Sequence, residues 1–308
     1  MPPMTSIRHL TWFLALGLFW GVSPSLYRYL ADIRMPETHT IVLTGFGVGV
    51  IMIAVALIRD GWRGLDPRIP AYGTMCAFLM NIPFGINLFL AAHVPPTELS
   101  IIITMSPFFN YLLALVTQTE NASWRRLVAI AFGFASTIVL IATRPQAASG
   151  GFSWWLVIAI SVPLMYTAYN FYAANHWPRG ASVMQAGAAE SLASGLLMLP
   201  LLLWLSPPGA ATNPSINLYV VLAAVTLMWV VERIAYFTLV NEKGAVYTVQ
   251  ATYISTPAAV AIGAFFFGGG TDKWLWVSLS LLMIALWLNN TGRKDVAIAP
   301  ANPESHPG

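Results

Sequence analysis

Long apolar stretches, separated by short polar segments, recur along the whole chain. A helix needs about 20 apolar residues to cross the ~30 Å hydrocarbon core of a bilayer. Stretches of about that length occur ten times, so the pattern predicts ten membrane-spanning helices. Their expected ranges are 10–30, 38–58, 70–92, 97–117, 124–143, 152–175, 181–205, 216–240, 245–267 and 274–290.

Two of these stretches contain a proline near the middle. Ser106-Pro107 interrupts the fourth stretch, and Thr256-Pro257 takes the matching place in the ninth, 150 positions later. A proline removes one backbone hydrogen bond inside a helix and favours a kink. Since lipid cannot hydrogen-bond a freed carbonyl, such a break must face protein or water. Paired broken helices are typical of a secondary transporter's binding site, and we expect Pro107 and Pro257 to be hinges.

The matching offset also predicts an internal repeat. Trp124 and Trp274, again 150 positions apart, each open the last span of a half. Because five is odd, a second set of five spans crosses the membrane in the opposite sense, which makes an inverted-topology repeat. The expected fold is an all-α polytopic membrane protein with ten transmembrane helices in two inverted five-helix repeats. These repeats occupy residues 1–146 and 147–290, and residues 291–308 form a cytoplasmic polar tail.

Composition and charge agree with a membrane protein and orient it. Hydrophobic residues make up 57% of the chain and charged residues only 9%, whereas soluble domains are about 25% charged. With the amino terminus in the cytoplasm, 10 Lys and Arg side chains lie on the cytoplasmic side and 4 on the other. The positive-inside rule therefore puts both termini in the cytoplasm. The single cysteine, Cys76, leaves no intrachain disulfide.

Several spans carry aromatic and polar residues on one helical face, at the spacing i, i+3, i+4, i+7. The hydrocarbon core would not favour such a face toward lipid. We therefore expect these faces, from the first, third, sixth, eighth and ninth spans, to surround a central cavity that binds substrate. The residues expected to line it are Trp20, Tyr27, Met80, Asn87, Tyr166, Tyr169, Asn170, Trp229, Glu232, Arg233, Tyr236, Tyr247 and Gln250.

The ninth span offers two faces. Tyr247, Gln250 and Pro257 lie on one side, while Thr252 and Ser255 lie roughly opposite. Small hydroxyl residues commonly pack against neighbouring helices in membranes. We therefore assign the Tyr247 side to the cavity and the Thr252 side to packing.

Glu232 and Arg233 are the strongest individual candidates. Each charge costs roughly 2.5–3.5 kcal/mol inside a span on insertion scales, so both must face protein or water. Two interpretations stand side by side. The pair either binds substrate or forms a structural ion pair, for which Glu190 of the seventh span is the candidate partner.

The chain resembles the drug/metabolite transporter superfamily in its ten-span form with two EamA-like repeats. The resemblance rests on Trp20-Gly21, on the run 106–120 and on the run 123–133. Overall the chain is most similar to the bacterial aromatic amino acid exporters. The resemblance implies a bacterial inner-membrane protein with a cavity lined by both halves, and with the fifth and tenth spans peripheral.

The expected function is alternating-access export of aromatic amino acids or similar small metabolites, with the lipid bilayer as surroundings and no cofactor, metal or nucleic acid. The chain shows no Walker A, HExxH or GxSxG motif, so neither an ATP-driven pump nor an enzyme is expected. Export of other amino acids, drugs or metabolites on the same fold is the first alternative. A passive channel is the second.

Overall fold

The computed structural model describes residues 7–33, 35–60, 66–117, 122–143, 154–205, 216–267 and 273–291. Within these ranges the chain forms helices and no strand. The helices are α1 (Ile7–Asp32), α2 (Glu37–Asp60), α3 (Arg68–Ala91), α4 (Pro96–Ile103), α5 (Ser106–Val116), α6 (Trp124–Ala142), α8 (Trp154–Asn175), α9 (Val183–Leu205), α10 (Ile216–Lys243), α11 (Ala245–Val249), α12 (Thr252–Phe267) and α13 (Lys273–Thr291).

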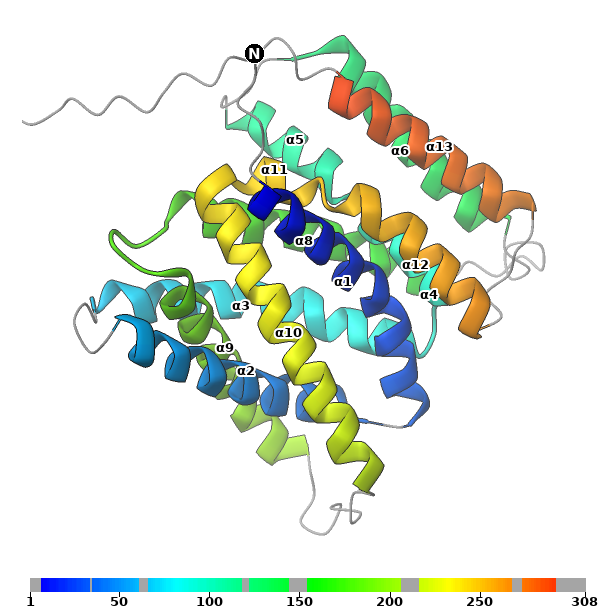
Figure 1. Ribbon diagram of the computed structural model, residues 1–308. Helices are drawn as coiled ribbons and strands as arrows, with labels where there is room; N and C mark the ends of the chain where they lie inside the picture. The colour runs from blue at the N-terminus through cyan, green and yellow to red at the C-terminus, as the bar shows by residue number, and fades with distance from the viewer. Residues whose placement is uncertain are drawn as a thin grey trace, which may run out of the picture.

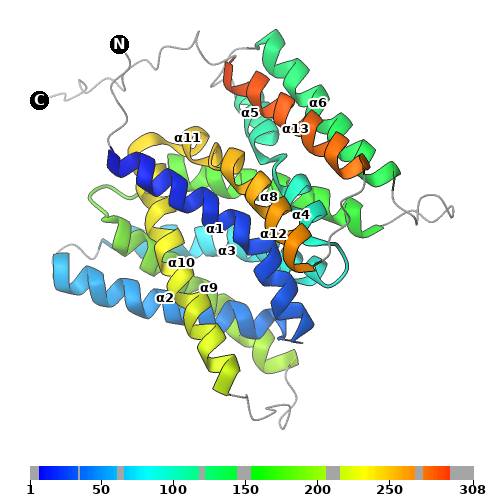
Figure 2. The same cartoon turned by 45° about the vertical axis from the view of Figure 1, so that its right-hand side comes forward.

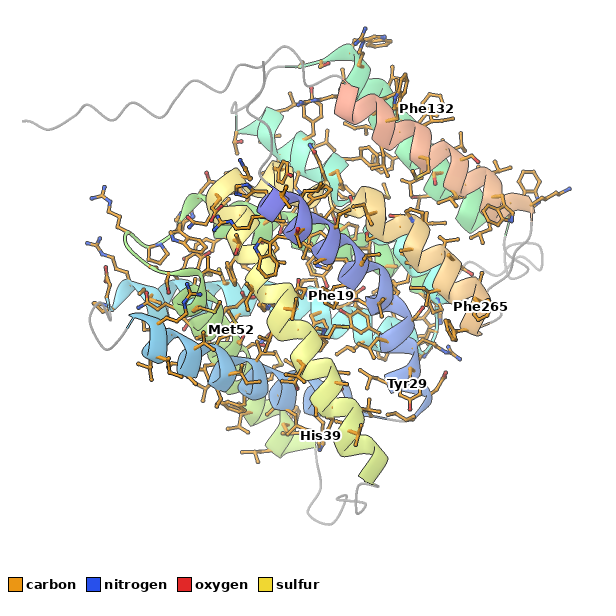
Figure 3. All side chains as sticks on the ribbon, viewed as in Figure 1. Phe19, Tyr29, His39, Met52, Phe132 and Phe265 are labelled. Atoms are coloured by element: carbon orange, nitrogen blue, oxygen red, sulfur yellow. The ribbon has the colours of Figure 1, made fainter. Side chains whose placement is uncertain are left out.

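The helices correspond to the ten expected spans. The fourth span consists of α4 and α5, the ninth of α11 and α12, and every other span of one helix. In the described part of the chain, seven helices are long and apolar enough to cross a membrane, and shorter apolar helices accompany them. Phe265, whose exposed fraction is 82%, projects from the end of α12 (Figure 3), as a lipid-facing side chain would. The protein is an all-helical polytopic membrane protein.

Both broken spans satisfy their free carbonyls with nearby hydroxyl groups. At the α4–α5 break, Ser106 Oγ donates to Ile103 O at 2.8 Å. At the α11–α12 break, Thr252 Oγ1 donates to Val249 O at 2.8 Å. The hydroxyl groups of Thr104 and Thr256 are hydrogen-bonded to each other, so the two broken spans cross close to their breaks. Side-chain hydroxyls are a common way to satisfy a backbone interrupted at membrane depth.

The two breaks do not lie at matching positions. Pro107 stands at the start of α5, directly after the first break. The second break lies at Gln250 and Ala251, while Pro257 sits inside the continuous helix α12. The expectation of a matched break at Pro257 is therefore wrong, because this helix accommodates its proline without ending there.

Packing between the spans is reciprocal. Each of α2, α4 and α6 packs on the helix five spans later, namely α9, α12 and α13, and the contact of α3 with α8 is mirrored by that of α1 with α10. Figures 1 and 2 show α6 and α13 side by side at the edge of the bundle. Two five-span repeats predict such packing. The expected boundary at 146/147 and the tail after residue 291 lie outside the described residues.

Small residues bring the helices around the centre into close contact. A Cβ atom added at Gly45 of α2 would lie 2.9 Å from the backbone nitrogen of Gly195 in α9. One added at Gly73 of α3 would lie 2.5 Å from the carbonyl carbon of Ala189, also in α9. Membrane helices gain their association energy largely from such close packing. The position of α9, which carries Glu190, is therefore set by glycines of the first half.

Candidate functional site

A cavity of about 140 Å³ lies between the two halves of the chain. This volume is smaller than those of typical small-molecule sites, about 300–1,000 Å³. Its walls come from α1, α2, α3, α4, α5, α8, α9, α10, α11 and α12. Neither α6 nor α13 lines it, so the fifth and tenth spans are peripheral, as the resemblance implies.

Eleven of the thirteen residues expected in the cavity do line it. They are Trp20, Tyr27, Met80, Asn87, Tyr166, Tyr169, Asn170, Trp229, Glu232, Arg233 and Tyr236. Sequence reasoning missed several small polar residues that share these walls. Among them are Thr44, Asn81, Ser191, Ser194, Thr252 and Ser255.

The assignment of faces in the ninth span is wrong. Tyr247 and Gln250 are not among the residues that line the cavity, whereas Thr252 and Ser255 are. The ring of Tyr247 instead packs on that of Phe13, with centroids 5.2 Å apart. The helical projection assumed one continuous helix, but the break between α11 and α12 changes the phase of the residues beyond it.

A cluster of three charged side chains, which we call the charged cluster, contains Glu190, Glu232 and Arg233. Arg233 Nη1 lies 3.3 Å from Glu190 Oε1, and Arg233 Nε lies 3.8 Å from Glu232 Oε2. Tyr169 joins both ends of the first pair, because its hydroxyl donates to Glu190 Oε2 at 3.1 Å and accepts from Arg233 Nη1 at 3.3 Å. Trp20 Nε1 donates to Glu232 Oε1 at 2.9 Å. Arg233 is therefore paired with Glu190, the candidate partner that the sequence analysis named.

The three charged side chains are shielded to different degrees. The exposed fraction of the side chain is 1% for Glu190, 12% for Glu232 and 16% for Arg233. Glu232 and Arg233 line the cavity, whereas Glu190 lies behind them. A molecule in the cavity can thus reach Glu232 and Arg233 directly and Glu190 only through Arg233.

Aromatic rings form much of the remaining wall. Tyr169 and Tyr236 stack with centroids 5.4 Å apart and planes inclined by 18°. Trp229 meets Phe84 edge to face at 5.0 Å, and Phe84 meets Tyr27 at 5.5 Å. Such rings offer both apolar surface and the negative faces that attract cations.

Asn87 carries an acceptor that is not satisfied by the described residues. Its Nδ2 donates to the hydroxyl of Tyr166 at 2.8 Å, while its Oδ1 is buried and has no partner in the described part of the chain. The residue is 1% exposed and lines the cavity. Leaving a buried acceptor unpaired typically costs about 1–3 kcal/mol.

The end of the bundle where α1 begins is closed. Leu16, Tyr72 and Phe237 belong to a buried apolar cluster directly beyond the charged cluster. At the surface of this end, Arg8 Nη2 donates to Glu242 Oε1 at 2.6 Å. Among the described residues, the lining of the cavity reaches no further toward this end than Trp20 on α1 and Met80 on α3.

The first half of the chain matches a known protein family. Residues 8–142 fit the sequence profile of the EamA-like transporter family. The match covers the five spans of the first half, which are therefore similar to that family. No curated protein sequence matches the chain significantly.

A solved structure extends the likeness over both halves. It is described only as the crystal structure of a protein, and it is 14% identical to this chain with a TM-score of 0.64. The alignment covers 95% of this chain and 100% of the other. At this identity the likeness shows the fold.

Proposed function

We propose that the chain is a secondary transporter that exports aromatic amino acids or similar small metabolites by alternating access. The observation that carries this proposal is the central cavity, which combines an aromatic wall with the charged cluster. Tyr169, Tyr236 and Trp229 offer ring surfaces to an aromatic substrate. Glu232 offers a carboxylate oxygen to its ammonium group, and hydrogen bonds between ionised partners are about twice as strong as neutral ones.

The alternating motion is proposed to involve the two broken spans. The two spans meet where Thr104, at the first break, contacts Thr256 of α12, and Thr104 lines the cavity. A short interrupted helix can reorient at its break. Pro107 stands at one break, so it is the stronger candidate for a hinge than Pro257. The closed end beside Arg8 would then be one of the two gates, open in the opposite conformation.

The proposed setting is the bacterial inner membrane with both termini in the cytoplasm. Its support is the excess of Lys and Arg on one side of the spans, which the positive-inside rule assigns to the cytoplasm. In this proposed orientation, the end of the bundle where α1 begins faces the cytoplasm.

Counterflow in proteoliposomes tests the proposal. Vesicles that contain the purified full-length protein are loaded with unlabelled phenylalanine, tyrosine, tryptophan or alanine and diluted into labelled substrate. A carrier for aromatic metabolites shows transient accumulation of label with the aromatic loads and none with alanine. Trp229→Ala should reduce this accumulation by about two- to tenfold, since ring stacking is worth about 0.5–1.5 kcal/mol beyond its buried area.

Trp276 provides the matched control. It lies on the peripheral helix α13 and is 52% exposed, so Trp276→Ala should leave counterflow unchanged. Flux that only equilibrates, without accumulation, would identify a passive channel. Accumulation of alanine but of no aromatic compound would show that the protein transports another class of substrate on the same fold.

A further inference from the structure

The packing between helices divides the bundle into two groups. The first, which we call the α2 group, contains α2, α3, α9 and α10, and the second, which we call the α12 group, contains α1, α4, α5, α6, α8, α11, α12 and α13. Figures 1 and 2 show α2 and α9 on one side of the bundle and α12, α6 and α13 on the other. Each group takes corresponding spans from both halves of the chain. The second and third spans join the seventh and eighth, and the first, fourth and fifth join the sixth, ninth and tenth.

Close contacts at glycines hold each group together. A Cβ atom added at Gly21 of α1 would lie 2.8 Å from the Cβ of Ala258 in α12, and one added at Gly49 of α2 would lie 2.6 Å from the Cγ of Leu192 in α9. Among the described glycines, every one whose added Cβ would lie within 3.4 Å of another helix meets that helix inside its own group. Helices that interlock so closely cannot slide past each other without a clash. These glycines are Gly17, Gly21, Gly45, Gly47, Gly49, Gly73, Gly133, Gly187 and Gly195.

The boundary between the groups is built from polar side chains and rings instead. It runs chiefly where α3 packs on α8 and where α1 packs on α10. Tyr72 Oη of α3 donates to Ala173 O of α8 at 2.9 Å. Trp20 Nε1 of α1 donates to Glu232 Oε1 of α10 at 2.9 Å. Long side chains can rotate to other partners, whereas interlocked backbones cannot. The cavity lies on this boundary, because both groups contribute to its lining.

Two of the connections that link the groups contain a glycine with a positive φ angle. Gly180, between α8 and α9, has a φ of 76°, and Gly244, which alone joins α10 to α11, has a φ of 80°. Glycine adopts such angles without strain and is therefore suited to sharp changes of direction. Hinges between moving bodies are commonly a few connecting residues of this kind. The chain thus has flexible joints where it passes between the groups.

We propose that these two groups are the moving bodies of the transport cycle, so that the α2 group rocks against the α12 group. This inference rests on the proposed function and describes its motion. Both broken spans belong to the α12 group and move with it, joined by the hydroxyl contact between Thr104 and Thr256. The rival scheme moves the first half of the chain against the second. The two schemes differ at contacts that join the halves inside one group, since only the rival scheme must change them.

Two pairs of residues allow disulfide bonds at such contacts. Ser136 of α6 and Ser278 of α13 lie in the α12 group, and their hydroxyl oxygens are 2.9 Å apart. Gly47 of α2 and Thr226 of α10 lie in the α2 group, and a Cβ atom added at Gly47 would lie 3.6 Å from the Cβ of Thr226. Disulfides join Cβ atoms that are about 3.5–4.5 Å apart. None of the four residues is among those that line the cavity.

Counterflow of phenylalanine in proteoliposomes, before and after oxidation, tests the inference. The variants are Ser136→Cys/Ser278→Cys, Gly47→Cys/Thr226→Cys and the combination of both, each with Cys76→Ala. Loss of labelling by a thiol reagent verifies each disulfide. Rocking of the two groups predicts that oxidation changes counterflow by less than about twofold in every variant. Movement of one half against the other predicts a loss of at least about tenfold in the combined variant, because its two bonds fix the halves to each other.

A crosslink across the boundary is the opposite control. Arg8 of α1 and Glu242 of α10 form an ion pair, and both are accessible to solvent. In Arg8→Cys/Glu242→Cys, a bismaleimide that bridges the two thiols should stop counterflow, because it holds the groups together at one end. The same reagent should leave the counterflow of each single cysteine variant unchanged.

The outcomes separate this inference from the proposed function. If oxidation abolishes counterflow in a disulfide variant and reduction restores it, the two mixed groups are refuted while aromatic transport stands. If one cysteine pair prevents folding, the other pair decides by the same criterion. The inference is likewise refuted if the bismaleimide bridge between α1 and α10 leaves counterflow unchanged. If the unmodified protein accumulates no aromatic compound, the proposed function fails, and this inference fails with it.

Discussion

Removing the positive charge of Arg233 should destabilise the protein more than any single change of a lipid-facing or surface residue. Arg233 is the only cation in the charged cluster, 3.3 Å from Glu190 and 3.8 Å from Glu232. At an effective dielectric constant of about 20, these attractions are worth about 5 and about 4 kcal/mol before desolvation is counted. In Arg233→Gln both are lost, and the two carboxylates repel each other.

The net loss is smaller than the sum of these attractions, because burying a guanidinium is itself costly. Removing one partner of a buried ion pair typically lowers the free energy of unfolding by about 3–5 kcal/mol. For a chain of this size, about 2 °C of melting temperature corresponds to each kcal/mol, so Arg233→Gln should lower the melting temperature by about 6–10 °C. Tryptophan fluorescence during heating in detergent measures this change.

The double variant Glu190→Gln/Arg233→Gln tests the physical reason. It removes the more deeply buried carboxylate together with its partner and leaves Glu232 with the hydrogen bond from Trp20. It should recover at least half of the lost melting temperature. Arg59→Gln, at the exposed end of α2, is the matched control and should shift the melting temperature by less than about 1 °C, as surface changes do. A double variant no more stable than the single one would refute the argument.

Three further predictions concern packing, the broken spans and topology. Gly73→Ala should lower both thermal stability and transport, because the added Cβ would lie 2.5 Å from the backbone of α9. Gly85→Ala on the same helix is the control. Its Cβ would meet nothing closer than 3.8 Å, so it should change neither measurement. Pro107→Ala should straighten the fourth span, and it should reduce flux strongly while changing the melting temperature little. Pro257→Ala should have a smaller effect on flux. Normal flux in both variants would refute the hinge hypothesis. In a cysteine-free background, a cysteine in place of Arg63 should resist membrane-impermeant reagents added to intact cells, and rapid labelling would reverse the topology.

Much of the fold could be predicted because every span is subject to the same physical constraint. A bilayer requires about 20 apolar residues in a row with every backbone group satisfied internally. The apolar stretches consequently predict the helices to within a few residues, as α3 (Arg68–Ala91) and α9 (Val183–Leu205) show. The charges of Glu232 and Arg233 predicted a protein or water environment for the same reason, and both line the cavity.

The errors occur where the helix is not continuous. A helical projection assigns faces only while the rotation of 100° per residue persists, and the break at Gln250 and Ala251 ends it. Thr252 and Ser255 therefore face the cavity although their spacing from Tyr247 suggested the opposite. Nothing in the sequence marks this break, because the visible signal, Pro257, lies inside a helix instead. Pro257 therefore predicted correctly which span is broken, but not where the break lies.

The distribution of charge between the halves has a consequence for the proposed transport cycle. Glu190, Glu232 and Arg233 lie on the adjacent spans α9 and α10, so they can move as one unit. Among the described residues, Trp20 of the first half donates a hydrogen bond to Glu232 of this cluster, and its ring lies 6.3 Å from that of Tyr236 on α10. Separating buried ions costs several kcal/mol, whereas one hydrogen bond contributes about 1.5–3 kcal/mol when one partner is charged. Alternation therefore need not break the ion pairs within the charged cluster, whereas opening the end where α1 begins must separate Arg8 of α1 from Glu242 of α10.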